Sequence, residues 1–245
     1  MRMWRGWEAE AANWAAFART PGHDRSHEVV NLPAFRGLLP EPGSATLDLG
    51  CGEGRLSRLL AGEGHRVVGL DAAPTMVRFA ATHEEAAGPV VNGDAAVLPF
   101  RDGAFDLVVA YMCLHDIDTM PQTVAEAARM LRPGGRLCAA IPHPVNTAGR
   151  FQARAGDAPF VITGSYLDAH PTQDVVDRDG IRLTFHSEHR PLEAYCLALE
   201  RAGLLIEAIR EICVPDEFVK LDPARHRWQR IPLFLHLRAV KPVSR

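Results

Sequence analysis

The sequence has few of the features expected of a membrane protein, a disulfide-bonded protein or a zinc protein. Its five cysteines are an odd number and none lies in a CxxC pair, which argues against both disulfides and zinc. No run of about 18 apolar residues is present, and the first segment, MRMWRGWEAEAANW, carries charges where a signal peptide needs an apolar core. We therefore expect a soluble cytoplasmic protein with no metal and no membrane partner.

The charges give no sign of a nucleic-acid partner. There are 27 basic and 30 acidic side chains, a formal net charge of −3, and no cluster of Lys and Arg beyond ordinary helix faces. Binding through phosphate neutralisation is therefore not expected. A length of 245 residues suits one sizeable α/β domain with a subdomain, and is too short for two full α/β domains.

Strand-like and helical runs alternate from Ala45 onward. The strand-like runs are near-continuously apolar, as in TLDLG, RVVGLD, PVVNGD, FDLVVAYM and GRLCAAIPH. This alternation is typical of a parallel sheet covered on both faces by helices, and it predicts a doubly wound α/β sheet. Ligands of such folds bind at the C-terminal ends of the strands.

The remaining segments divide the chain into four expected parts. Residues 1–43 should form a helical cap, with an amphipathic helix over 3–18 and a second helix from His27 to Leu39. Residues 44–143 form the core, and the irregular residues 144–189 read as an inserted hairpin or lid after the fifth strand. Residues 190–245 complete the sheet with a helix ended by Gly203 and the closing strand PLFLHLRAV.

A glycine-rich turn joins the first strand to a helix in TLDLGCGEGRLSRLL. Such a turn lets backbone N–H groups approach a ligand closely. Its glycines are Gly50, Gly52 and Gly54, and Arg55 stands where a dinucleotide fingerprint needs its third glycine. A phosphate-binding Walker loop is also absent, because no Gly-Lys-Ser/Thr follows. The turn therefore argues against a nicotinamide oxidoreductase.

Three acids lie on, or at the end of, the first three strands of the core. Asp48 precedes the glycines, where a carboxylate would repel a pyrophosphate but suits a positive amino group. Asp71 ends the second strand, where an acid can accept hydrogen bonds from both hydroxyls of a ribose. Asp94 ends the third, within reach of an adenine amino group. An amine, a ribose and an adenine without phosphate describe S-adenosylmethionine.

Five segments then follow one another in a set order: LDLGCGEG (47–54), VVGLDAAPTMVRFA (67–80), GDAAVLPF (93–100), FDLVVAYMCLHDI (105–117) and RMLRPGGRLCAAIPHP (129–144). In them the sequence resembles the class I S-adenosylmethionine-dependent methyltransferases, and in particular the type 11 small-molecule methyltransferase domain. The resemblance covers about residues 44–145. It implies a doubly wound, seven-stranded, mostly parallel sheet whose last strand is antiparallel.

The resemblance also implies a cofactor site for S-adenosylmethionine. It places the three turn glycines and a nearby acid under the methionine and ribose, an acid on the ribose hydroxyls, and further residues around the adenine and methionine. In this order the residues are Gly50, Gly52, Gly54, Asp48, Asp71, Ala72, Met76, Asp94, Ala95, Ala110 and Tyr111.

The expected reaction needs few catalytic groups. Methyl transfer from a sulfonium is an in-line displacement, so the enzyme mainly aligns the acceptor and excludes water. A base is needed only where the acceptor must lose a proton, and histidine is the natural choice. His115, just past the fourth strand, and His143, which leaves the fifth, are the candidates.

The sequence therefore predicts methyl transfer to O, N or C of a small organic acceptor, with the acceptor and oligomeric state undefined. The N-terminal aromatics and those of the insertion are candidates for lining the acceptor site: Trp4, Trp7, Trp14, Phe17, Phe151, Phe160 and Tyr166. One alternative is a protein that binds S-adenosylmethionine, or a non-methylating enzyme on the same fold. A protein or RNA methyltransferase is a further variant, which an open groove would favour.

Overall fold

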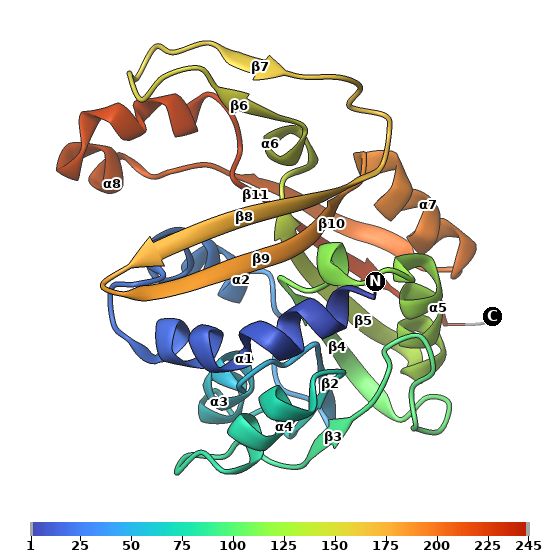
Figure 1. The fold of residues 1–245 in the computed structure, drawn as a ribbon. Coiled ribbons are helices and arrows are strands. Elements are labelled where there is room, and N and C mark those ends of the chain that lie inside the picture. The colour runs from blue at the N-terminus through green and yellow to red at the C-terminus, as the bar shows by residue number, and fades with distance from the viewer. Residues whose placement is uncertain (1, 244–245) are drawn as a thin grey trace.

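The fold is a seven-stranded sheet with helices on both faces (Figure 1), seen in a computed structural model that describes residues 2–243. The strand order is β10-β11-β5-β4-β1-β2-β3. Neighbouring strands from β5 to β3 run parallel, whereas β11 is antiparallel to both β5 and β10, so the predicted fold class is confirmed. The strands are β1 (Thr46–Leu49), β2 (Val67–Asp71), β3 (Val90–Asn92), β4 (Phe105–Tyr111), β5 (Leu131–Pro142), β10 (Leu205–Ile212) and β11 (Phe234–Val240).

Two layers of apolar side chains hold the sheet between its helices. All four residues of β1 are buried, as expected for a central strand that faces helices on both sides. On one face the core includes side chains of α5 (Met120–Met130) and α7 (Leu192–Arg201). On the other face it includes side chains of α2 (Leu32–Arg36) and α3 (Arg55–Gly62). These helices fix the strand ends from which the site is built.

The N-terminal segment forms helices close to those predicted. Helix α1 spans Met3–Arg19 and packs against α4 (Pro74–Ala81). The second expected helix is divided into a π-helical segment, η1 (Ser26–Asn31), and α2, which ends at Arg36 rather than Leu39. Gly37 is the C-cap residue of this helix.

The segment after β5 contains one short helix and two pairs of strands. Helix α6 (Pro144–Ala148) leads into β6 (Gly149–Phe151), which pairs with β7 (Phe160–Ile162). The hairpin of β8 (His170–Arg178) and β9 (Ile181–His189) lies along α1 (Figure 1). Sequence periodicity does not mark β8, because most of its side chains are exposed and polar. The division of the chain into four parts stays a prediction.

The remaining elements lie at the ends of strands. They are η2 (Leu114–Asp116) after β4, and α8 (Asp216–Leu221) and η3 (Pro223–Gln229) between β10 and β11. None of the helices in the described part of the chain is both long and apolar enough to span a bilayer. Within residues 2–243, no group of three or more His, Cys, Asp or Glu side chains is placed to hold a metal ion.

Candidate active site

A cavity of about 1100 Å³ opens at the C-terminal ends of β1, β2 and β4. Its other walls come from α1, η1, the β8–β9 hairpin and η3. Ten of the residues predicted from the sequence line it: Asp48, Gly50, Gly52, Asp71, Ala72, Met76, Asp94, Ala95, Tyr111 and His115. The tertiary structure thus brings most of the predicted cofactor residues to one place.

Three other predicted residues do not line this cavity: Gly54, Ala110 and His143. Ala110 is fully buried in the core beneath the sheet, because neighbouring residues of a strand face opposite sides and Tyr111 takes the cavity side. Gly54 instead begins α3 with a positive φ of 86°, and a Cβ there would lie 3.1 Å from that of Ala80. Neither residue lines the cavity, and the assignment of both to the cofactor stays a prediction.

The glycine turn folds tightly over the end of β2. The N–H groups of Gly50 and Cys51 both donate to the carbonyl of Leu70, at 2.8 and 3.0 Å. Gly50 has a φ of 69°, and a Cβ at this position would stand 2.6 Å from the Cβ of Cys113. A side chain here would therefore meet both backbone strain and a clash, so the turn needs glycine.

Asp71 fastens this turn to the start of the next helix. One of its carboxylate oxygens accepts the N–H of Gly52 at 2.8 Å, and the other accepts the N–H of Ala73 at 2.8 Å. Burial raises the pKa of Asp71, and the backbone hydrogen bonds oppose that shift. The carboxylate is held rigidly at the end of β2, on the cavity wall.

Asp48 lies deeper, at 2% exposure, and accepts a hydrogen bond of 2.5 Å from the Ser57 hydroxyl. Burial raises its pKa to about 7, with a smaller contribution from Asp71. Neither acid forms an ion pair with a basic side chain among the described residues. Two such carboxylates on one cavity wall fit a ligand that brings its own positive charge and its own hydroxyl donors, as S-adenosylmethionine does.

The raised pKa of Asp48 predicts a pH-dependent cost to folding. The folded protein keeps a proton that the unfolded chain, with the ordinary pKa of 3.8, releases as the pH rises toward 7. The free energy of unfolding therefore falls across this window. Asp48→Asn removes this titration. The increase in the free energy of unfolding that the substitution gives the ligand-free protein should therefore be larger at pH 8 than at pH 5, by on the order of 2 kcal/mol. Urea denaturation at both pH values measures the difference in the free energy of unfolding between variant and wild type, and Asp168→Asn, at an exposed position, is the control. An effect of Asp48→Asn that is the same at both pH values would contradict the prediction.

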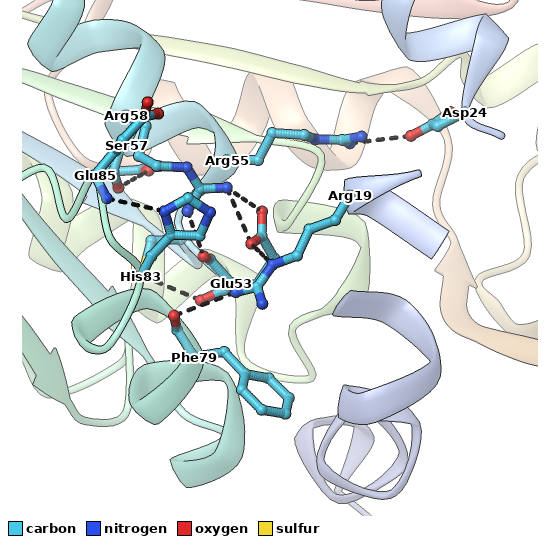
Figure 2. Close-up of polar contacts among 12 residues, drawn as sticks. Arg19, Asp24, Glu53, Arg55, Ser57, Arg58, Phe79, His83 and Glu85 are labelled. Carbon is cyan, nitrogen blue, oxygen red and sulfur yellow. Dashed lines mark hydrogen bonds and ion pairs between the residues drawn. The ribbon is translucent and has the colours of Figure 1, made fainter. Parts of the chain in front are cut away.

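Glu53 links the glycine turn, to which it belongs, to α1 and α3 (Figure 2). Its carboxylate is 1% exposed and accepts hydrogen bonds from Arg58 of α3 at 2.8 and 3.0 Å and from Arg19 of α1 at 2.8 Å. Nearby, Arg55 pairs with Asp24 at 3.0 Å. The arginine at the position of the third glycine thus contacts the N-terminal segment, and both residues of this pair line the cavity. No sequence pattern marks this pairing, which joins residues 31 positions apart.

An aromatic cluster from α1 and β9 covers the cavity. Trp7 meets Trp14 and Phe185 edge-on at 5.8 Å between ring centroids, and Trp14 meets Phe185 at 6.0 Å. The Ser187 hydroxyl of β9 also donates to Asp116 of η2 at 2.7 Å. The hairpin is therefore bound both to the helical cap and to the loop after β4.

Only some of the aromatic residues that were predicted to line the cavity do so. Four of the seven line it: Trp4, Trp7, Trp14 and Phe17. Three do not: Phe151, Phe160 and Tyr166. Phe151 stacks edge-on with Phe160 and with Trp228, and Trp228 takes its place on the wall together with Phe185 and Phe218.

The structure gives little support to His143 as a base. Its side chain is buried and lies outside the cavity lining. Its Nδ1 accepts the N–H of Val145 to cap α6, and its Nε2 lies 2.9 Å from a carboxylate oxygen of Glu211. Both ring nitrogens are engaged, so this histidine holds the segment that leaves β5.

His115 lines the cavity, but its side chain is buried. Its Nε2 lies 3.2 Å from Asp116, and its Nδ1 is sealed from solvent and has no hydrogen-bond partner among residues 2–243. Burial, together with Arg190, lowers the pKa of His115 to about 3. The imidazole is neutral and faces a carboxyl group whose pKa burial raises well above its usual range.

A different histidine is better placed, and sequence analysis did not single it out. His27 of η1 lines the cavity, and its Nδ1 lies 2.9 Å from the hydroxyl of Tyr111 at the end of β4. Its Nε2 forms no hydrogen bond within the described residues. Burial and the guanidinium of Arg55 lower the pKa of His27 to about 4, against a raising effect of Asp24. His27 is therefore a neutral imidazole at pH 7, with one nitrogen available.

Comparison with known proteins supports the interpretation of this site. A family model described as a methyltransferase domain matches residues 47–139. A ubiquinone biosynthesis O-methyltransferase of a Methylobacterium species is 43% identical over 108 residues. A demethylmenaquinone methyltransferase of Tropheryma whipplei is 35% identical over 99 residues. These alignments cover 42% and 39% of this chain, and 43% and 40% of the two relatives, so the chain spans less than half of the length of either.

A solved structure extends the similarity beyond the matched domain. A S-adenosylmethionine-dependent methyltransferase of Mesorhizobium loti is 27% identical, with a TM-score of 0.70. The alignment covers 85% of this chain and 96% of that protein. The similarity therefore includes elements outside residues 47–139.

Proposed function

Since the match over residues 47–139 identifies this chain as a member of the class I S-adenosylmethionine-dependent methyltransferases, with S-adenosylmethionine as cofactor, we propose that it methylates a small organic acceptor at O, N or C. One observation carries the proposal. A single cavity joins the carboxylates of Asp48 and Asp71 to a space closed by the aromatic side chains of α1 and β9. A volume of about 1100 Å³ suits a small molecule together with the cofactor.

S-adenosylmethionine supplies a methyl group on a positively charged sulfur. Asp71 is suited to accept hydrogen bonds from its ribose hydroxyls, and Asp48 to balance its positive charge. Ala72, Met76, Asp94 and Ala95 line the part of the cavity proposed for the adenine. The glycine turn allows the ligand to approach the backbone, as Gly50 leaves no side chain in the way.

Helix α1 and the β8–β9 hairpin are assigned the two remaining roles, to exclude water and to align the acceptor. The cluster of Trp7, Trp14 and Phe185 excludes water from the space above the strand ends, which limits hydrolysis and strengthens electrostatic contacts within. The walls then align the acceptor with the transferable methyl group. For an acceptor that must lose a proton, we assign the role of base to His27, with Tyr111 holding its ring in place.

The composition of the chain supports a proposal for the setting of this activity. We propose that it acts in the cytoplasm on a freely diffusing acceptor, without a nucleic-acid or membrane partner. The net charge of −3 supports this, as does the presence of cysteines without disulfides.

Production of S-adenosylhomocysteine tests the function directly. The purified chain is incubated with S-adenosylmethionine and a panel of phenols, amines and enolisable ketones, and the product is measured by chromatography. We expect at least one acceptor class to raise S-adenosylhomocysteine well above the level found without acceptor. Cofactor binding in calorimetry with no acceptor-dependent product across the panel would instead favour a non-methylating protein.

A further inference from the structure

The charges that line the cavity are unevenly distributed. The acids Asp48, Asp71 and Asp94 lie at the ends of β1, β2 and β3. Arginines gather at the other end, around α8 and η3, next to β11. Arg2 and Arg55 also line the cavity, but each is paired with an acid, Arg2 with Asp94 at 3.4 Å and Arg55 with Asp24 at 3.0 Å. In the sheet, β11 is separated from β1 by β5 and β4, so the two ends of the cavity lie near different strands (Figure 1).

Contacts among aromatic rings and guanidinium groups define the basic end. Arg25 and Arg225 both lie over the ring of Phe218, at 5.5 and 3.8 Å from its centroid. Arg227 lies over Trp228 at 5.7 Å. The backbone carbonyl of Arg154 accepts a hydrogen bond from Arg227 at 2.9 Å, which brings the β6–β7 loop to the same place. We call this set of Arg25, Arg154, Arg225, Arg227, Phe218 and Trp228 the arginine end.

Few acids balance the arginine end. Asp222 pairs with Arg225 at 3.4 Å, and Asp24 is already paired with Arg55. Hairpin β8–β9 adds one charge of each sign, with Asp174 and Arg178. Arg25 and Arg154 are exposed, and neither forms an ion pair within the part of the chain described. Among the residues that line the cavity, the arginine end therefore has an excess of positive charge, although α8 carries Asp216 and Glu217 outside the lining and the chain as a whole is negative.

Apolar side chains accompany this charge. Val214, Phe218 and Phe234 form a small core with Val30, against which Trp228 packs, and all but Val30 also line the cavity. A guanidinium offers five donors in a planar fork, so the backbone bonds of Arg227 leave donors available for a ligand. Such a combination recognises an anionic group attached to an apolar body.

We infer that the acceptor carries a carboxylate or phosphate group on an apolar or aromatic body, which the arginine end binds while its reactive atom points toward β1 and β4. This inference rests on the proposed function, because it assigns the acceptor half of the same cavity. The uneven distribution of charge suits a cationic cofactor at the acidic end of the cavity and an anionic acceptor at the arginine end.

Binding of small probes tests the inference without a known acceptor. Protein saturated with S-adenosylhomocysteine is titrated by calorimetry and ligand-observed NMR with benzoate, phenyl phosphate and the neutral analogue benzamide. We expect at least one of the two anions to bind about tenfold more tightly than benzamide, which corresponds to about 1.4 kcal/mol. The advantage should shrink as salt is added. The two anions separate a carboxylate from a phosphate site.

Variants locate the binding site. Arg25→Gln changes an exposed side chain without disturbing an ion pair, and Arg227→Gln removes a second charge. Each should reduce the advantage of the anion, whereas Arg201→Gln on the exposed surface of α7 should leave it unchanged. Equal or undetectable binding of all probes, or an advantage that both variants leave intact, would overturn the inference. Acceptor-dependent S-adenosylhomocysteine would still form in that case, which separates this failure from failure of the proposed function.

Discussion

Replacing Asp71 with alanine is expected to weaken S-adenosylmethionine binding about 100-fold or more, because hydrogen bonds to a charged group contribute about 1.5–3 kcal/mol each. The carboxylate stands at the end of β2 and lines the cavity where the ribose is proposed to bind. Isothermal calorimetry with the cofactor measures the change.

Asp71 also holds the turn, so the experiment needs a variant that separates the two roles. Alanine leaves the N–H groups of Gly52 and Ala73 without their acceptor, whereas Asp71→Asn retains one acceptor oxygen. Thermal denaturation should show Asp71→Asn to be the more stable of the two, with cofactor affinity still reduced. Asp168→Ala, an exposed acid outside the cavity, is the matched control. Wild-type affinity in Asp71→Ala would remove Asp71 from the site.

Replacing His27 with asparagine is expected to lower kcat by about 100-fold to 10,000-fold for an acceptor that must lose a proton, the range typical of general bases. An asparagine amide can take the place of Nδ1 and keep a hydrogen bond to Tyr111, while the second ring nitrogen is lost. Cofactor affinity should stay close to that of the wild type.

The dependence on pH distinguishes a base from a packing role. Because burial and Arg55 lower the pKa of His27 to about 4, the imidazole is neutral over the whole neutral range and accepts a proton there. The wild-type rate should fall only as the pH drops toward that value, and this dependence should be absent in His27→Asn. His143→Ala is the matched histidine control and should affect stability more than turnover. A rise in KM with unchanged kcat in His27→Asn would show that His27 only positions the acceptor.

Much of the fold and the cofactor half of the site could be predicted, because the sequence patterns that indicate them lie within short stretches of the chain. Buried parallel strands are near-continuously apolar, so β1, β2, β4 and β5 were found from the sequence. The glycine turn and the strand-end acids lie within a few residues of these strands, and the parallel arrangement brings them to one edge. Strand β8 was missed, since its exposed residues carry no apolar alternation.

The acceptor half of the site was predicted less well, because its contacts join distant parts of the chain. His27 and Tyr111 are 84 residues apart, and no periodicity or motif relates them. The two histidines chosen for their position near strand ends are engaged in other contacts: His143 caps a helix and His115 faces Asp116. Position along a strand predicts which end of the sheet a residue reaches, but not the direction of its side chain in a loop.

The sequence by itself determined the alternation of strands and helices in residues 44–143, the glycine turn and the acids that accompany it, because backbone conformation and burial act over a few neighbouring residues. Only the tertiary structure decided which histidine meets the cavity, how Phe185 closes against Trp7, and where the arginines gather. Those contacts depend on how the cap, the hairpin and the C-terminal segment pack on the sheet. That packing is set by the shapes of whole elements, which no short stretch of sequence contains.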